Sequence, residues 1–272
     1  MAARLRFLAK EARRDLTITV IVLVWIGLAL VVDATVEVPP PWEPVRRILL
    51  GLGTWGLLVG MLLREAPLVR AQTAVVVVLA TAVEYTFSPL LEAYTYRIGT
   101  VPLFVPPGHG LVYLAALALG RSALLRAAPR AAVGTTVAVG GVWAAAGLAG
   151  VPRPDVLGAF WFACLLGFLI WGRSTLLYVG AFVVVGYLEL LGTCLGTWAW
   201  AVRDPVLGVI SQGNPPSGAA GGYGWFDLYA LLGAPGVLTV ARSARQRAQD
   251  TFVQFTVRRE GVAPERAVDA VE

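Results

Sequence analysis

The sequence predicts an all-α polytopic membrane protein with about eight transmembrane helices. Hydrophobic residues make up 57% of the 272 residues and charged residues only 14%, whereas soluble domains carry about a quarter charged residues. The mean hydropathy is +0.72. Apolar runs of about the length that crosses a bilayer fill nearly the whole chain and leave no room for a second folded domain. We therefore expect a single membrane domain in a bacterial plasma membrane.

The predicted spans follow one another with short links that carry arginine. They cover residues 16–32, 48–63, 71–87, 101–119, 131–150, 156–171, 174–195 and 219–241. The second is short, and Pro106-Pro107 interrupt the fourth, so the start of that helix and a re-entrant course for the proline-rich loops stay open. Residues 1–15 form a cytoplasmic flank, which is either an amphipathic helix on the inner surface or an ordinary basic segment. Residues 242–272 form a cytoplasmic tail.

The basic residues predict the orientation of these spans. If both termini are cytoplasmic, most of the 22 Lys and Arg residues lie on the inner side, as cytoplasmic links require. The exceptions are Arg46, Arg47, Arg97, Arg153 and Arg203. Because the arginines stand at the ends of apolar runs, they orient helices, and we do not expect a nucleic acid partner.

One pattern occurs twice, about a hundred residues apart. Glu84 is followed by Tyr94-Thr95-Tyr96, and Glu189 by Trp198-Ala199-Trp200; a proline-rich turn comes after each. The repetition predicts two parallel four-helix repeats, residues 16–130 and 131–241, with a cavity between them. Glycine pairs four residues apart, at 56/60, 192/196 and 218/222, predict close helix contacts.

Four ionisable residues are candidate catalytic groups, because such groups are costly inside a membrane and are commonly functional there. Asp227 would lie near the middle of the last span. Glu84 and Glu189 occupy matching positions, and a carboxyl kept from water can act as a general acid or base. His109, the single histidine, lies near the start of the fourth span, where the helix end favours the neutral ring. Each also has a structural interpretation: Asp227 as a helix contact, the glutamates as loop braces and His109 as a hydrogen-bonded residue.

Aromatic and polar residues near the same helix ends are candidate substrate-binding groups. They are Tyr94, Tyr96, Arg97, Trp198, Trp200, Asn214 and Tyr223. An interfacial aromatic belt and a rigid turn at residues 214–218 would explain the same residues without a ligand. Cys164 and Cys194 stand far apart and without metal-ligand spacing, so we expect neither a metal nor a cofactor.

The segment 189–200 resembles a motif of the polytopic carotenoid-biosynthesis family. Glu189, Gly192, Gly196, Trp198 and Trp200 fit its pattern of Glu-x-x-Gly-x-x-x-Gly-x-aromatic-x-aromatic. That family includes hydratases that add water to long carotenoids. The resemblance implies a membrane-embedded hydratase or other lyase acting on an isoprenoid or lipid-linked substrate. Protonation of an alkene requires an acid, for which Glu189, Asp227 and Glu84 are the candidates.

Two other classes remain open at this point. A proton-coupled transporter or lipid flippase would use the same acidic residues to couple proton movement to transport, and it predicts a pathway open in turn to both faces. A non-catalytic membrane assembly subunit predicts that Glu84, His109, Glu189 and Asp227 are scattered. The expected ligand is a membrane lipid or isoprenoid, and both a homo-oligomer and a membrane protein partner are compatible with the sequence.

Overall fold

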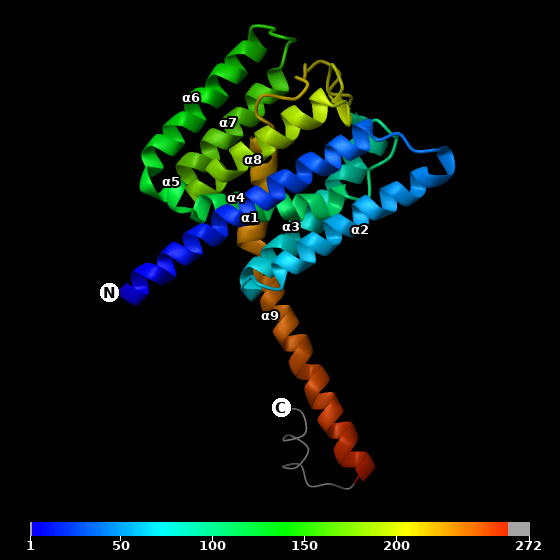
Figure 1. Cartoon of the computed structure of the whole chain (residues 1–272), viewed down its shortest axis with the longest axis vertical. Coiled ribbons are helices and arrows are strands. Elements are labelled where there is room, and N and C mark those ends of the chain that lie inside the picture. The colour runs from blue at the N-terminus through cyan, green and yellow to red at the C-terminus, as the bar shows by residue number, and fades with distance from the viewer. Residues whose placement is uncertain (1, 261–272) are drawn as a thin grey trace.

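The computed structural model describes residues 2–260, with side chains described for residues 13–251. The structure is almost entirely helical (Figure 1). The long helices are α1 (Ala2–Thr35), α2 (Glu43–Leu62), α3 (Pro67–Tyr85), α4 (Val105–Arg121), α6 (Pro129–Leu148), α7 (Val156–Trp171), α8 (Thr175–Cys194) and α9 (Ala219–Glu260). Shorter elements are η1 (Pro40–Trp42), the π-helical turn η2 (Thr86–Leu90), α5 (Ala123–Ala127), β1 (Tyr94–Tyr96) and β2 (Trp198–Trp200).

Among the described residues, seven helices are long and apolar enough to cross a membrane. The eighth long helix, α7, is apolar but has only 16 residues. Each of these eight long helices overlaps one of the eight predicted spans. The helical, polytopic class expected from the sequence thus agrees with the observed lengths and compositions.

Three helix limits differ from the predicted ones. α1 continues without a break through residues 2–35, so the predicted flank and first span share one helix, and α9 runs past residue 241 to Glu260 (Figure 1). α4 begins at Val105, with Pro106 and Pro107 in its first turn. Proline is well tolerated there because the first amides of a helix have no partner within it. The proline pair therefore starts this helix and does not interrupt it.

Helix α4 forms the centre of the bundle. It packs against α8, α1, α3 and α2, and most of its residues are buried. α9 packs against α3, α7 and α8. Two of the predicted glycines make close contacts: a Cβ on Gly218 would overlap Gly158 O of α7, and a Cβ on Gly192 would overlap the Trp198 ring. A further close contact is made by a glycine outside the predicted pairs. A Cβ on Gly221 would lie 1.8 Å from the Trp161 carbonyl oxygen of α7, whereas Gly56 and Gly60 have nothing within 4 Å of a Cβ and make no such contact.

Two short strands, which the sequence analysis did not predict, join the two halves of the chain. β1 and β2 pair antiparallel, with Tyr94 opposite Trp200 and Tyr96 opposite Trp198. Backbone bonds from Arg97 N to Thr197 O (2.9 Å) and from Ala201 N to Ala93 O (3.0 Å) extend the pairing. Successive side chains of a strand point to opposite faces, so these four rings share one face. We call the side of the bundle that carries β1 and β2 the strand end.

The opposite end is held by ion pairs among α1, the α2–α3 link and α4. Arg14 lies 2.6 Å from Glu65, and Arg121 lies 3.4 Å from Asp15 and 3.6 Å from Glu65. Glu65 is buried, and pairing with two arginines offsets the cost of removing its charge from water.

Candidate functional site

A cavity of about 870 Å³ lies in the half of the bundle next to the strand end. Its lining comes from the later halves of α1, α3 and α8, from the first parts of α4, α7 and α9, and from both strands. Most of the lining is apolar. Farther from the strand end the interior is filled by side chains at most 2% exposed, including Tyr113, Leu114, Leu165, Leu177 and Tyr178. The cavity therefore occupies one half of the bundle, and its size is that of a small-molecule site.

The first polar group in this cavity is built around Glu84. This residue lies in the last turn of α3, and η2 then turns the chain toward β1. The Tyr96 hydroxyl donates to Glu84 Oε2 at 2.7 Å, and His109 Nε2 lies 2.8 Å from Glu84 Oε1. Both Glu84 and His109 are 6% exposed. His109 Nδ1 is buried and has no hydrogen-bond partner among the described residues.

The second polar group is built around Glu189 of α8. Trp198 Nε1 and Trp200 Nε1 both donate to Glu189 Oε2, at 3.1 and 3.0 Å. Glu189 is 3% exposed, and within the described part of the chain its Oε1 has no hydrogen-bond partner. Each glutamate is thus bonded by the strand that follows its own helix, and both line the same cavity.

Aromatic rings close the strand end of the cavity. The ring centroids of Tyr94 and Trp200 are 4.7 Å apart, and those of Tyr96 and Trp198 are 6.1 Å apart. Burial raises the pKa of both Tyr94 and Tyr96 above the usual value, and the neighbouring Glu84 carboxyl raises it further. Both phenols therefore stay protonated, and that of Tyr96 donates to Glu84. Tyr223 of α9 stacks on His109, with centroids 5.3 Å apart and an interplanar angle of 23°.

Asp227 does not join the other candidate acids. It is buried, at 4% exposure, but lies one turn beyond Tyr223 on α9 and does not line the cavity. Its Oδ2 has no hydrogen-bond partner within the described residues. Phe226 and Tyr229, on either side of Asp227 in the sequence, do line the cavity, so Asp227 has the expected depth but lies on another face of α9, which the sequence alone does not show.

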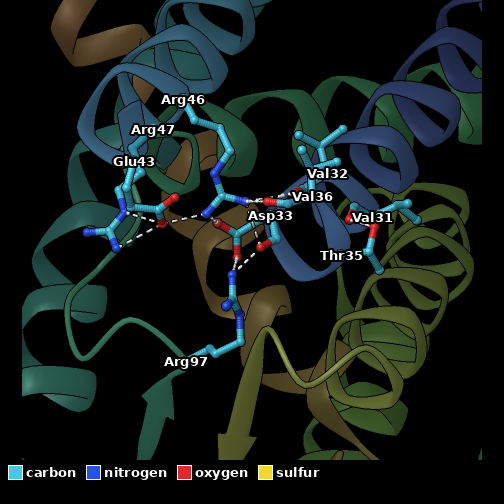
Figure 2. A network of polar contacts seen from close by, with 9 residues as sticks. All are labelled: Val31, Val32, Asp33, Thr35, Val36, Glu43, Arg46, Arg47 and Arg97. Carbon is cyan, nitrogen blue, oxygen red and sulfur yellow. Dashed lines mark hydrogen bonds and ion pairs between the residues drawn. The ribbon is translucent and has the colours of Figure 1, made fainter. Parts of the chain in front are cut away.

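Arg97 and Asn214 also lie outside the cavity lining. Figure 2 shows Arg97 beside Asp33, to whose main-chain oxygen it donates; its Nη2 lies 3.5 Å from the Asp33 carboxylate. Arg46 lies in the same network and donates to Val32 O at 2.8 Å and to Glu43 at 2.5 Å. The network caps the C-terminal end of α1 and links it by hydrogen bonds to α2, through Arg46, and to the loop after β1, through Arg97. Asn214 Oδ1 accepts from Trp200 N at 2.9 Å and so supports β2.

Two residues that the sequence did not indicate hold β2 and the segment 212–217 in place. Arg153 donates to four carbonyl oxygens, those of Gln212 (2.7 Å), Trp200 (2.9 Å), Gly213 (2.9 Å) and Ala201 (3.1 Å). The buried Asp155 accepts from Gly158 N at 2.9 Å, which caps α7, and also from Gly213 N (2.6 Å) and Ser217 N (2.7 Å). An aspartate directly before the apolar run 156–171 is a helix-start signal that could have identified Asp155; the contacts of Arg153 have no local signal.

Within the described residues, no group of three or more His, Cys, Asp or Glu side chains could hold a metal ion. Comparisons of the chain with models of protein families, with curated proteins and with solved structures gave no match. The class of protein is therefore described from the fold and the site alone. The chain has the helices of a polytopic membrane protein, and one half of its bundle holds an apolar cavity that carries two hydrogen-bonded glutamates and a histidine.

Proposed function

We propose that this protein is a membrane-embedded enzyme that adds water to a double bond of an isoprenoid substrate, without a cofactor. The observation that carries the proposal is the presence of two differently bonded carboxyl groups in one apolar cavity. The lining suits a hydrocarbon chain, and polar groups are confined to a few positions. The resemblance of residues 189–200 to the carotenoid-biosynthesis family supports the same substrate class.

In this proposal Glu189 is the general acid. A neutral carboxyl group suits its buried site, because burial disfavours the charged form. The two indole N–H groups bond to Oε2, so Oε1 is left to carry the proton toward the substrate. These donors also stabilise the carboxylate that forms when the proton leaves.

Glu84 and His109 together activate the water. In the tautomer whose Nε2–H donates a hydrogen bond to Glu84, the unpartnered Nδ1 keeps a lone pair, and the imidazole can accept a proton. The Glu189 proton bonds to one alkene carbon, and the π electrons form the new C–H bond. Water oxygen then bonds to the cationic carbon and passes a proton to the Glu84–His109 pair. That proton returns to Glu189 through water, so the net reaction is alkene plus water to alcohol.

The location of the cavity also bears on transport. A carrier needs a pathway that opens to both faces, whereas here the half of the bundle beyond the cavity is filled with buried side chains. This one-sided arrangement supports catalysis over a proton-coupled carrier or flippase. The gathering of Glu84, His109 and Glu189 around one space supports it over an assembly subunit.

We further propose that the strand end faces outward and that the two halves are parallel repeats. The arginine distribution supports an outward strand end with cytoplasmic termini, because Arg14, Arg64, Arg70, Arg121, Arg126 and Arg173 all adjoin the opposite helix ends. The antiparallel pairing of β1 with β2, each following a helix that carries a bonded glutamate, supports the duplication.

An isotope experiment tests the reaction. The full chain, reconstituted in vesicles with an acyclic C40 polyene, is incubated in water enriched in oxygen-18, and the product is analysed by mass spectrometry. We expect one labelled hydroxyl per added water. Glu189→Gln and Glu84→Gln should lower the rate at least about a hundredfold, the usual contribution of a general acid or base, and the exposed Glu37→Gln should not. Unlabelled product, or an unchanged rate in Glu189→Gln, would refute the proposal.

A further inference from the structure

The cavity reaches the surface on the side of the bundle. Among its lining residues, Phe87, Phe160, Val206, Leu207, Trp225 and Tyr229 are exposed. They come from η2, α7, the loop after β2, and α9, and we call the opening between them the lateral mouth. Trp225 and Tyr229 stand six and ten residues into α9, which corresponds to about 9 and 15 Å along the helix axis. On a helix that spans the bilayer from its first turn, residues at that depth face acyl chains.

A hairpin of residues 202–212 borders this mouth. Its ladder consists of Asp204 N to Ile210 O (2.8 Å) and Gln212 N to Val202 O (3.1 Å). Residues 205–210 carry no charge, and three side chains of the tip project outward: Val206 is 61% exposed, Leu207 58% and Val209 78%. Such a tip is unfavourable in water, because it exposes a contiguous apolar surface.

Three amides of the tip are bonded within the hairpin. Asp204 Oδ1 accepts from Val206 N (3.1 Å) and Leu207 N (2.8 Å), and Asp204 O accepts from Gly208 N (2.7 Å). Each paired amide lowers the cost of bringing a loop into contact with acyl chains, since an unpaired amide costs several kcal/mol there. The tip therefore combines exposed apolar side chains with three amides, those of Val206, Leu207 and Gly208, that do not need water.

We infer that the 202–212 hairpin dips into the bilayer beside the lateral mouth, and that the substrate reaches Glu84 and Glu189 sideways from the membrane, past this hairpin. The inference rests on the proposed function for the identity of the substrate. The position of the hairpin relative to the lipid does not depend on the reaction and can be measured without turnover.

Depth-dependent quenching tests the position of the hairpin. In the full chain with Cys164 and Cys194 replaced by Ala, a fluorescent bimane is attached to Val209→Cys, a position outside the cavity lining, or to Thr95→Cys on the exposed face of β1. In vesicles, brominated acyl chains should quench the label at 209, and iodide in the water should not. The label at 95 should behave in the opposite way. Iodide quenching of equal strength at both positions would overturn the inference.

A transfer experiment tests the route. Energy transfer from tryptophan to parinaric acid, a fluorescent polyene fatty acid, reports how fast this probe passes from vesicles into the protein. Val209→Asp should slow the transfer on the order of tenfold, because a carboxylate disfavours insertion of the tip into lipid. The occupancy at equilibrium should equal that of Val209→Leu and of the unmodified protein. An unchanged rate in Val209→Asp would contradict the sideways route, whereas loss of oxygen-18 incorporation alone would contradict only the proposed reaction.

Discussion

At the scale of single residues, the two cavity glutamates differ in their hydrogen-bond donors. Glu84 is bonded by a phenol and an imidazole, and Glu189 by two indoles. An imidazole can exchange a proton with its partner, whereas an indole N–H only donates. The difference assigns the two carboxyls to different parts of the proposed reaction: Glu84 acts through His109 on water, and Glu189 acts directly on the substrate.

Removal of the indole donors tests the role of Glu189. In Trp198→Phe/Trp200→Phe, the aromatic surface is largely kept, but the Glu189 carboxylate loses both donors. Glu189 should become a weaker acid, and kcat should fall roughly tenfold or more, with a small change in KM. Tyr94→Phe alters an aromatic residue of the same strand pair without removing a donor to Glu189, and it serves as the control. An equal loss of kcat in the control would show that ring packing, and not the indole bonds, matters.

The candidate residues could be predicted in part. Rare ionisable groups in apolar runs indicate Glu84, His109 and Glu189, and all three line the cavity. The sequence could not separate Asp227 from them, because depth along a helix does not show which face of α9 meets the cavity. Arg153 was missed because its four carbonyl partners lie 47 to 60 residues away along the chain.

At the scale of elements, the strands are the feature that local sequence could have indicated. Aromatic residues at alternate positions, 94 and 96 and again 198 and 200, fit the period of a strand. The pairing of the two segments could not be foreseen, because it depends on how α3, α4, α8 and α9 bring distant ends together. The helices themselves were predictable, since long apolar runs in a membrane must satisfy their backbone internally.

The contact between α7 and α9 positions two helices that line the cavity. Gly221 has no space for a side chain, because a Cβ would lie 1.8 Å from the Trp161 carbonyl oxygen. Gly221→Ala should push α9 away from α7 and lower stability by about 1–3 kcal/mol, the usual cost of overpacking. Thermal unfolding in detergent measures this change. Gly236→Ala on the same helix is the control, since nothing lies within 4 Å of its Cβ; equal melting temperatures for the two variants would contradict the tight α7–α9 contact.

At the scale of the whole molecule, the bundle divides into a hollow half next to the strands and a packed half at the other end. The strand pair, the Arg153 and Asp155 contacts and the network of Figure 2 all lie at the hollow end. Polar contacts thus add to the aromatic packing that holds the helix ends around the cavity. The membrane class could be predicted from composition, but the one-sided cavity could not, because it depends on which side chains fill the interior between helices.

The most direct test of this account measures what occupies the cavity. Gly108 lines the cavity, and a Cβ there has nothing within 4 Å, so Gly108→Leu should fill part of the space. Gly134→Leu on α6 is the matched control, since Gly134 is exposed and equally open. Lipids bound to each purified full-length protein are identified by mass spectrometry. We predict an isoprenoid bound to the unmodified protein and to Gly134→Leu, and several-fold less bound to Gly108→Leu; equal amounts in all three, or bulk phospholipid alone, would contradict the account.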